Sequence, residues 1–212
     1  IIYHNLYFCQ KISYNQIGEK MKTVIKEITN EIVINKSRFI AVLIPIKEKE
    51  NLNLILNKLK ERYKDATHYC YAYIMDNYQK ASDDGEPQKT AGMPILNCLV
   101  KNNLTDVLCV VIRYFGGIKL GAGGLVRAYS NAVKEVITKN EESIKELING
   151  FEIILEIPYD KQKDLESLLS CQYSKEYSSL VIYKIKCNKE LKENLEKLYS
   201  LKQIKETKIV SA

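Results

Sequence analysis

Residues 107–137 constrain the fold of this chain more than any other segment. The apolar run VLCVVI is followed by the glycine-rich stretch RYFGGIKLGAGGLVRAY at 113–129 and then by a helical pattern. A continuous apolar run of this length is typical of a buried strand. One face of the helix that follows carries the apolar residues Leu125, Ala128, Tyr129, Ala132, Val133, Val136 and Ile137. We therefore expect a buried strand, a tight glycine loop and a long amphipathic helix packed on a sheet.

The remaining pattern predicts two α+β domains. The first domain is expected over 21–140. Before the buried strand described above, its pattern predicts two strands around a turn at 35–37, an amphipathic helix at 48–65, a strand at 66–76 and a loop at 77–92. Residues 151–212 follow the β-α-β-β-α-β order of a ferredoxin-like sandwich, with Asp160 and Asn188 as expected helix caps.

The ends of the first domain are expected to carry little structure. The polar stretch 141–150 is expected to be a linker between the domains. Residues 1–20 precede the first methionine and lack a periodic apolar face, so we expect an upstream extension that contributes little to the fold.

Composition narrows the function classes. No apolar run is long enough to span a membrane. The six cysteines form no C-x-x-C pair and there are only two histidines, which argues against a zinc site and for reduced thiols in a cytoplasmic protein. Residues 21–140 hold 18 Lys or Arg against 12 Asp or Glu, whereas 151–212 hold 11 against 10. All four arginines also lie in the first domain, so an anionic partner is expected there.

The glycine loop is not a P-loop, because Ala122-Gly123 stands where a P-loop has Lys-Ser/Thr. It does not match the dinucleotide-binding pattern either. Its helix starts without a capping residue, so its first N–H groups and the helix dipole favour an anion. The expected anion- or nucleic-acid-binding residues are Arg113, Gly116, Gly117, Lys119, Gly121, Gly123, Gly124 and Arg127, the last in the first helical turn. Alternatively, the glycines only allow close packing at a corner.

Three carboxylates, Asp83, Asp84 and Glu86, lie in the stretch SDDGEP. They could hold Mg²⁺, act as acid or base, pair with Arg113 and Lys119, or simply form an Asp-Gly turn. His68 and Cys70 share one face of their strand but lack a third catalytic member, so no catalytic residue and no cofactor is expected.

Four segments, SRFIA (37–41), DATHYCYAY (65–73), SDDGEPQKTAGMPIL (82–96) and VVIRYFGGIKLGAGGLVRAYSNAV (110–133), resemble the YigZ/IMPACT family in order and spacing. Gln88-Lys89 stands where the family usually has Ser-Gly. The resemblance implies a first domain like elongation factor G domain IV, a fold shared with GHMP kinases, and a second like its domain V. It also implies translation control, because eukaryotic IMPACT proteins compete for an activator of the starvation-responsive initiation-factor kinase.

Two functions follow. One is a non-enzymatic, translation-associated regulatory protein that binds RNA or the ribosome through the basic first domain, with a protein of the translation machinery as a further candidate partner. The other is an enzyme acting on a small phosphorylated or anionic substrate through the 116–124 loop and the 83–86 carboxylates. Neither involves a membrane, and the oligomeric state is open.

Overall fold

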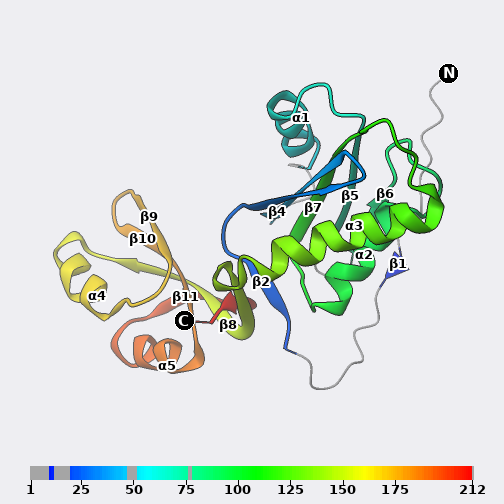
Figure 1. Cartoon of the computed structure of the whole chain (residues 1–212). Coiled ribbons are helices and arrows are strands. Elements are labelled where there is room, and N and C mark those ends of the chain that lie inside the picture. Colours follow the sequence, from blue (N-terminus) through cyan, green and yellow to red (C-terminus); the bar gives the residue numbers. More distant parts are fainter. Residues whose placement is uncertain (1–9, 12–19, 47–51, 76–77, 212) are drawn as a thin grey trace. The chain divides into compact units, whose positions relative to one another are not determined.

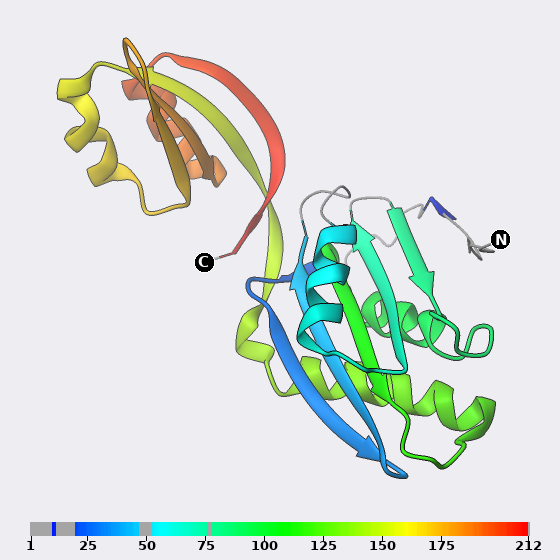
Figure 2. The same ribbon diagram turned by 90° about the horizontal axis from the view of Figure 1, so that it is seen from above.

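The computed structural model describes residues 10–11, 20–46, 52–75 and 78–211. The chain divides into two compact units, Ile1–Glu146 and Leu147–Ala212. Each is an α+β unit, and the ladders between its main strands are antiparallel (Figures 1 and 2). Within the described residues, no helix is long and apolar enough to cross a membrane.

The first unit is built on a six-stranded sheet with the order β1-β6-β5-β7-β4-β3. Its strands are β1 (Gln10–Lys11), β3 (Ile28–Ile34), β4 (Ser37–Pro45), β5 (His68–Met75), β6 (Tyr78–Ser82) and β7 (Val107–Tyr114). The apolar run predicted to be a buried strand is β7, which lies between β5 and β4 and is almost fully buried. A two-residue turn with positive φ at Asn35 and Lys36 joins β3 to β4, as predicted.

Helices cover both faces of this sheet. Helix α1 (Leu52–Arg62) packs on one face, and α2 (Gly92–Lys101) and α3 (Gly121–Thr138) pack on the other (Figures 1 and 2). The seven residues predicted for the apolar face of α3 are the residues that α3 buries. This agreement confirms the helical period read from the sequence.

The loop predicted over 77–92 is wrong in part. Residues 78–82 form strand β6, which pairs with β5, and of the described residues in this range only 83–91 are irregular. The strand has weak local propensity and depends on the hydrogen bonds offered by the exposed edge of β5. The predicted extension 1–20 lies mostly outside the described residues, but Gln10 and Lys11 pair with β6 as strand β1.

The second unit has the predicted β-α-β-β-α-β order. It comprises β8 (Ile144–Ile157) from Leu147 onward, α4 (Gln162–Leu168), β9 (Tyr173–Tyr177), β10 (Val181–Cys187), α5 (Lys189–Leu198) and β11 (Leu201–Val210), with the sheet order β11-β8-β10-β9. Asn188 caps α5 as expected, accepting a hydrogen bond from the Leu191 N–H at 2.9 Å. The expected cap at Asp160 is wrong, because Asp160 lies inside a 3-10 turn, Tyr159–Lys161, that precedes α4.

The segment 141–150, expected to be a linker, has regular structure. A 3-10 turn (Glu141–Ser143) leads directly into β8, whose residues 144–146 pair with β2 (Lys22–Val24). From Leu147 onward, β8 pairs with β11. The division between the two units nevertheless falls inside this segment, between Glu146 and Leu147. The strand forms here through backbone hydrogen bonds to segments far away in sequence, which its polar side chains do not indicate.

Candidate functional site

The glycine loop after β7 packs against the turn of the β3–β4 hairpin. The Gly116 N–H donates to Ser37 Oγ at 3.1 Å. A Cβ on Gly116 would lie 2.1 Å from the carbonyl carbon of Lys36, so no side chain fits there. Gly117 and Gly121 have φ of +84° and +70° and turn the backbone toward α3. These three glycines therefore shape the loop.

Helix α3 begins at Gly121 without a capping side chain, as predicted. Gly123 and Gly124 lie in its first turn. A Cβ on Gly123 would meet only the Arg127 Nη1 atom at 3.8 Å, whereas one on Gly124 would lie 3.0 Å from Leu120 Cβ. The first N–H groups of the helix therefore lack side-chain acceptors among the described residues, and the helix dipole gives this end a positive potential.

Three exposed cations belong to the segments that meet here: Lys36, Lys119 and Arg127. None of them has an ion-pair partner among the residues described. Arg127 lies in the second turn rather than the predicted first, because α3 starts at Gly121, but its guanidinium points back toward Gly123. We call the turn 35–36 together with residues 115–127 the loop end.

Asp83 caps helix α2 from nine residues away. Its Oδ1 atom accepts hydrogen bonds from the backbone N–H groups of Ala91 (3.0 Å) and Gly92 (2.8 Å), and its Oδ2 accepts one from the backbone N–H of Lys89 (2.8 Å). A carboxylate at a helix start satisfies unpaired donors and interacts favourably with the dipole. Asp83 is thus a structural residue of this loop.

Asp84 ties the same loop to the start of β5. Its Oδ2 accepts from the Tyr69 N–H at 2.7 Å, and its carbonyl oxygen lies 2.8 Å from His68 Nδ1. Because a carbonyl oxygen can only accept, His68 Nδ1 is the donor in this contact. Asp84 and Gly85 both have positive φ, so this part of SDDGEP is indeed a turn.

Glu86 is the buried member of the acidic loop, with its side chain 3% exposed. Its Oε1 accepts from Arg113 Nη1 at 2.5 Å and from the Tyr129 hydroxyl at 2.7 Å. Glu86 therefore joins β7 to α3 through one oxygen. Its second oxygen lies 3.9 Å from His68 Nε2. Of the alternatives for this carboxylate, the structure shows the pair with Arg113, and not one with Lys119.

Arg113, expected among the surface anion-binding residues, is instead buried. Its side chain is 6% exposed, and its guanidinium carbon lies 5.4 Å from the ring centroids of both Phe39 and Phe115. Arg113 lies on the face of β7 that packs against α3 and not toward solvent. Glu86 neutralises the charge of Arg113. A phosphate on the surface would not reach an already paired guanidinium at this depth.

Metal binding and thiol catalysis find no support in this geometry. Within the described residues, no group of three or more His, Cys, Asp or Glu side chains could hold a metal ion. Cys70 is buried and donates to the Asp83 carbonyl oxygen at 2.9 Å. Burial raises the pKa of the Cys70 thiol well above its usual range, so Cys70 is not an activated nucleophile.

Sequence reasoning missed two members of these sites. Lys36 was treated only as part of a turn, and Tyr129 only as part of a helix face. Lys36 reaches the loop end because the hairpin folds back on Gly116, and no sequence pattern indicates that contact. For Tyr129 a weak signal existed, since a buried tyrosine hydroxyl needs a hydrogen-bond partner.

Comparison with known proteins places these features in a family. The Impact N-terminal domain matches residues 35–137, a range that contains both loops. The chain is 51% identical over 109 residues to the IMPACT family member YvyE of Bacillus subtilis, covering 50% of each protein. It is 36% identical over 141 residues to the IMPACT family member YigZ of Escherichia coli, covering 64% of this chain and 68% of YigZ. This chain belongs to the IMPACT family.

The family resemblance inferred from the four sequence segments is thereby confirmed. The chain spans about half the length of the curated relatives that it matches from Bacillus subtilis and Haemophilus influenzae. A crystal structure of a hypothetical protein superposes on this IMPACT family member with a TM-score of 0.61 at 28% sequence identity. That match covers 88% of this chain and 96% of the other, so the two share a fold.

Proposed function

We propose that this IMPACT family member is a non-enzymatic, cytoplasmic regulatory protein of translation that binds RNA or the ribosome through its loop end. Family membership supports the link to translation, since this is the role that the resemblance implies. The likeness to domains IV and V of elongation factor G belongs to the same proposal. The α+β architecture of both units is compatible with a likeness to these two domains.

The observation that carries the proposal is the difference in ion pairing between the loop end and the second unit. Most lysines of the second unit are paired with carboxylates: Lys161, Lys175, Lys184, Lys186, Lys189, Lys192 and Lys202. At the loop end, Lys36, Lys119 and Arg127 have no such partner among the described residues. Cations without an internal partner are the ones that can neutralise phosphates.

Two further features of the loop end favour a nucleic acid. The open N–H groups of α3 add backbone donors of the kind that contact phosphate. Phe115, which belongs to the loop end, is 46% exposed, and exposed aromatic rings stack on bases of single-stranded RNA. Contacts to the RNA backbone, together with stacking of bases on an aromatic ring, would give RNA binding with little sequence preference.

The enzymatic alternative has less support. Asp83 caps α2, Asp84 holds β5, and Glu86 neutralises Arg113, so each carboxylate already has a structural partner. A general acid, a general base or a metal ligand needs lone pairs directed at a substrate or an ion. A protein of the translation machinery remains a further candidate partner for the same basic surface.

The test is co-sedimentation of the full chain with ribosomes over a series of salt concentrations. We expect the double variant Lys119→Ala, Arg127→Ala to bind more weakly and to lose up to about one unit of log–log salt slope per lost phosphate contact. The matched control, Lys163→Ala with Lys205→Ala, removes the same charge from the second unit and should bind like the parent. Equal affinity and equal slope for the parent and the loop-end variant would contradict the proposal.

The backbone contribution is tested separately by Gly123→Ala. The added methyl group meets only Arg127, so the helix should form as before and gain up to about 1 kcal/mol of stability. Binding should nevertheless weaken, because the methyl group limits close approach of a phosphate to the N–H groups. Unimpaired binding by this variant would remove the helix start from the proposed interface.

A further inference from the structure

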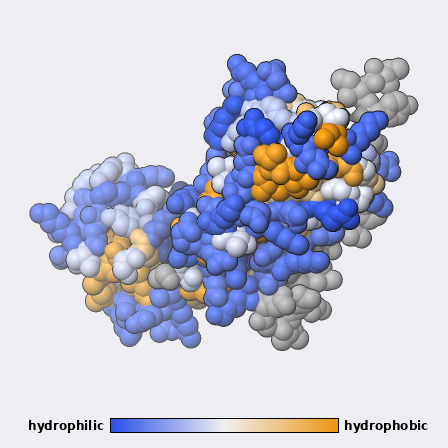
Figure 3. Space-filling model, in the orientation of Figure 1, coloured by the Kyte–Doolittle hydropathy of each residue, from blue (hydrophilic) through white to orange (hydrophobic). Residues whose placement is uncertain are grey.

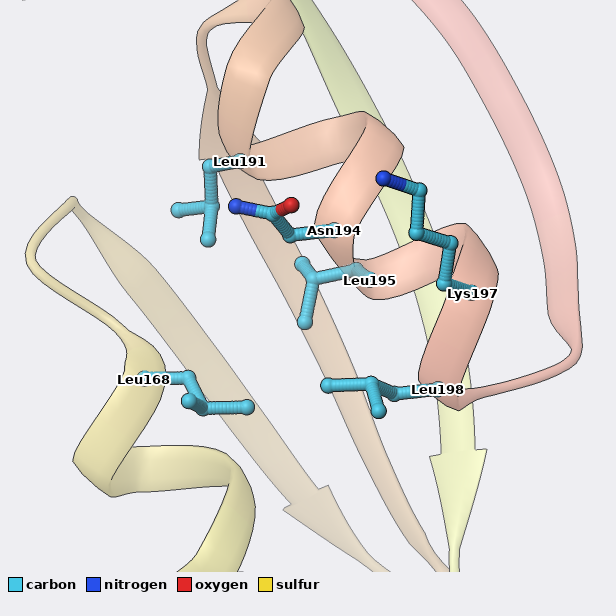
Figure 4. Close-up of a pocket in the computed structure, with 6 residues that line it drawn as sticks. All are labelled: Leu168, Leu191, Asn194, Leu195, Lys197 and Leu198. Carbon is cyan, nitrogen blue, oxygen red and sulfur yellow. The ribbon is translucent and has the colours of Figure 1, made fainter.

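An apolar groove separates the two helices of the second unit (Figure 4). Its volume is about 290 Å³. It is lined by Leu168 of α4 and by Leu191, Asn194, Leu195, Lys197 and Leu198 of α5. In Figure 3, hydrophobic surface of this unit gathers between α4 and α5.

Two of the leucines that line the groove are exposed to solvent. Leu198 is 62% exposed and Leu168 is 43% exposed, whereas Leu195 beneath them is fully buried. Leu191, Leu195 and Leu198 recur at i, i+4 and i+7, so one stripe of α5 serves both the core and the groove. An apolar stripe that extends beyond its own core is suited to binding another apolar surface.

The charge at the groove is also unbalanced. Two lysines of α5 pair with carboxylates one turn later, Lys189 with Glu193 and Lys192 with Glu196. Lys197 is the charged residue of the lining, and it has no ion-pair partner among the described residues. A ligand that supplies a carboxylate beside its apolar contacts would therefore complement this groove.

We propose that the α4–α5 groove binds an amphipathic helical segment of a partner protein, with leucine-like side chains between Leu168 and Leu198 and an acidic residue at Lys197. This is the helix-in-groove mode, in which side chains spaced at i, i+3, i+4 and i+7 anchor the ligand. The site lies in the second unit and is independent of the proposed RNA contact at the loop end.

The size of the groove favours a peptide segment over other occupants. About 290 Å³ is at the lower limit of pockets that enclose a small-molecule ligand, and this groove is open to solvent. A stable dimer of two copies would need roughly 1,200 Å² or more of buried surface, which four leucines do not supply. A few side chains of one helix match the space available.

The test uses a labelled helical peptide of roughly 16 residues, with leucines at i, i+3, i+4 and i+7 and glutamates beside them, titrated with the full chain by fluorescence anisotropy. A second peptide carries lysine in place of each glutamate. We expect the acidic peptide to bind and the basic peptide to bind about tenfold more weakly. Lys197→Glu should reverse that preference.

Leu198→Gln and Leu168→Gln should each weaken binding of the acidic peptide by about tenfold. The matched control is Leu54→Gln on α1, a leucine with 55% exposure in the other unit, which should leave binding unchanged. Circular dichroism of each variant establishes that the fold is retained. No binding of the acidic peptide, equal binding of the basic one, or indifference to Leu198→Gln would overturn the proposal. Self-association of the chain that Leu198→Gln abolishes would also overturn it, because the occupant would be a second copy.

Discussion

The buried pair between Glu86 and Arg113 should be the most sensitive point of the first unit. Glu86→Gln preserves the shape of the side chain and an acceptor for the Tyr129 hydroxyl, but removes the negative charge. Arg113, 6% exposed, would then be a buried cation without a counter-charge. Removing one partner of such a pair costs about 3–5 kcal/mol. We expect about 3 kcal/mol here, because the amide oxygen can still accept from the guanidinium.

Urea unfolding followed by circular dichroism measures this loss, as a shift of the first unit's midpoint by about 1–3 M. The matched control is Glu31→Gln, which removes the exposed pair of Glu31 with Arg38 and should cost at most about 1 kcal/mol. The double variant Glu86→Gln, Arg113→Met should recover much of the loss, since no unpaired charge stays buried. If Glu86→Gln is no more destabilising than Glu31→Gln, the reasoning about the buried charge is refuted.

Four other predictions address the loops, the second unit and the strand between the units. Gly116→Ala should destabilise the first unit by about 2 kcal/mol or more in urea unfolding, because its Cβ would lie 2.1 Å from the Lys36 backbone; a smaller cost than for Gly117→Ala would contradict this. Lys89 has φ of +61°, so Lys89→Gly should raise the free energy of unfolding by about 0.5–1 kcal/mol, and an unchanged value would count against strain there. Hydrogen bonds from Lys175 and Tyr183 lower the pKa of Glu166 in the folded protein below its ordinary value of 4.5. The ionised Glu166 therefore stabilises the fold above pH 4.5, and this stabilisation is lost as the pH falls through the pKa of Glu166 in the folded protein. Glu166→Gln should therefore lower the melting temperature at pH 7 but not at pH values well below 4.5, and an equal effect at both would exclude the charge as the cause. Limited trypsin digestion should spare Lys145, whose backbone is paired in β8, and early cleavage there would show that 141–150 is a linker after all.

The acidic loop shows why the roles of single residues were harder to predict than their positions. The sequence correctly placed Asp83, Asp84 and Glu86 in one turn-rich loop. Three different roles then arose from three different neighbours: the start of α2, the start of β5, and Arg113 with Tyr129. Those neighbours are set by how the loop packs between sheet and helix, and local propensity does not encode that.

The sequence alone determined the elements whose causes are local. The period of α3 and its buried face, the turn at Asn35 and Lys36, the Asn188 cap and the β-α-β-β-α-β order all depend on residues a few positions apart. Periodicity, capping and turn chemistry act over such distances, so they can be read directly from the chain.

Only the tertiary structure decided the contacts between distant segments. Gly116 packs on a hairpin 79 residues away, Arg113 lies buried beside Phe39 and Glu86, and β8 forms a strand through the stretch predicted to be a linker. In each case the residue is held by a partner that the sequence does not place beside it. Burial of a charge and pairing of a strand are properties of those partners, and they become predictable only once the packing of sheet, helices and loops is known.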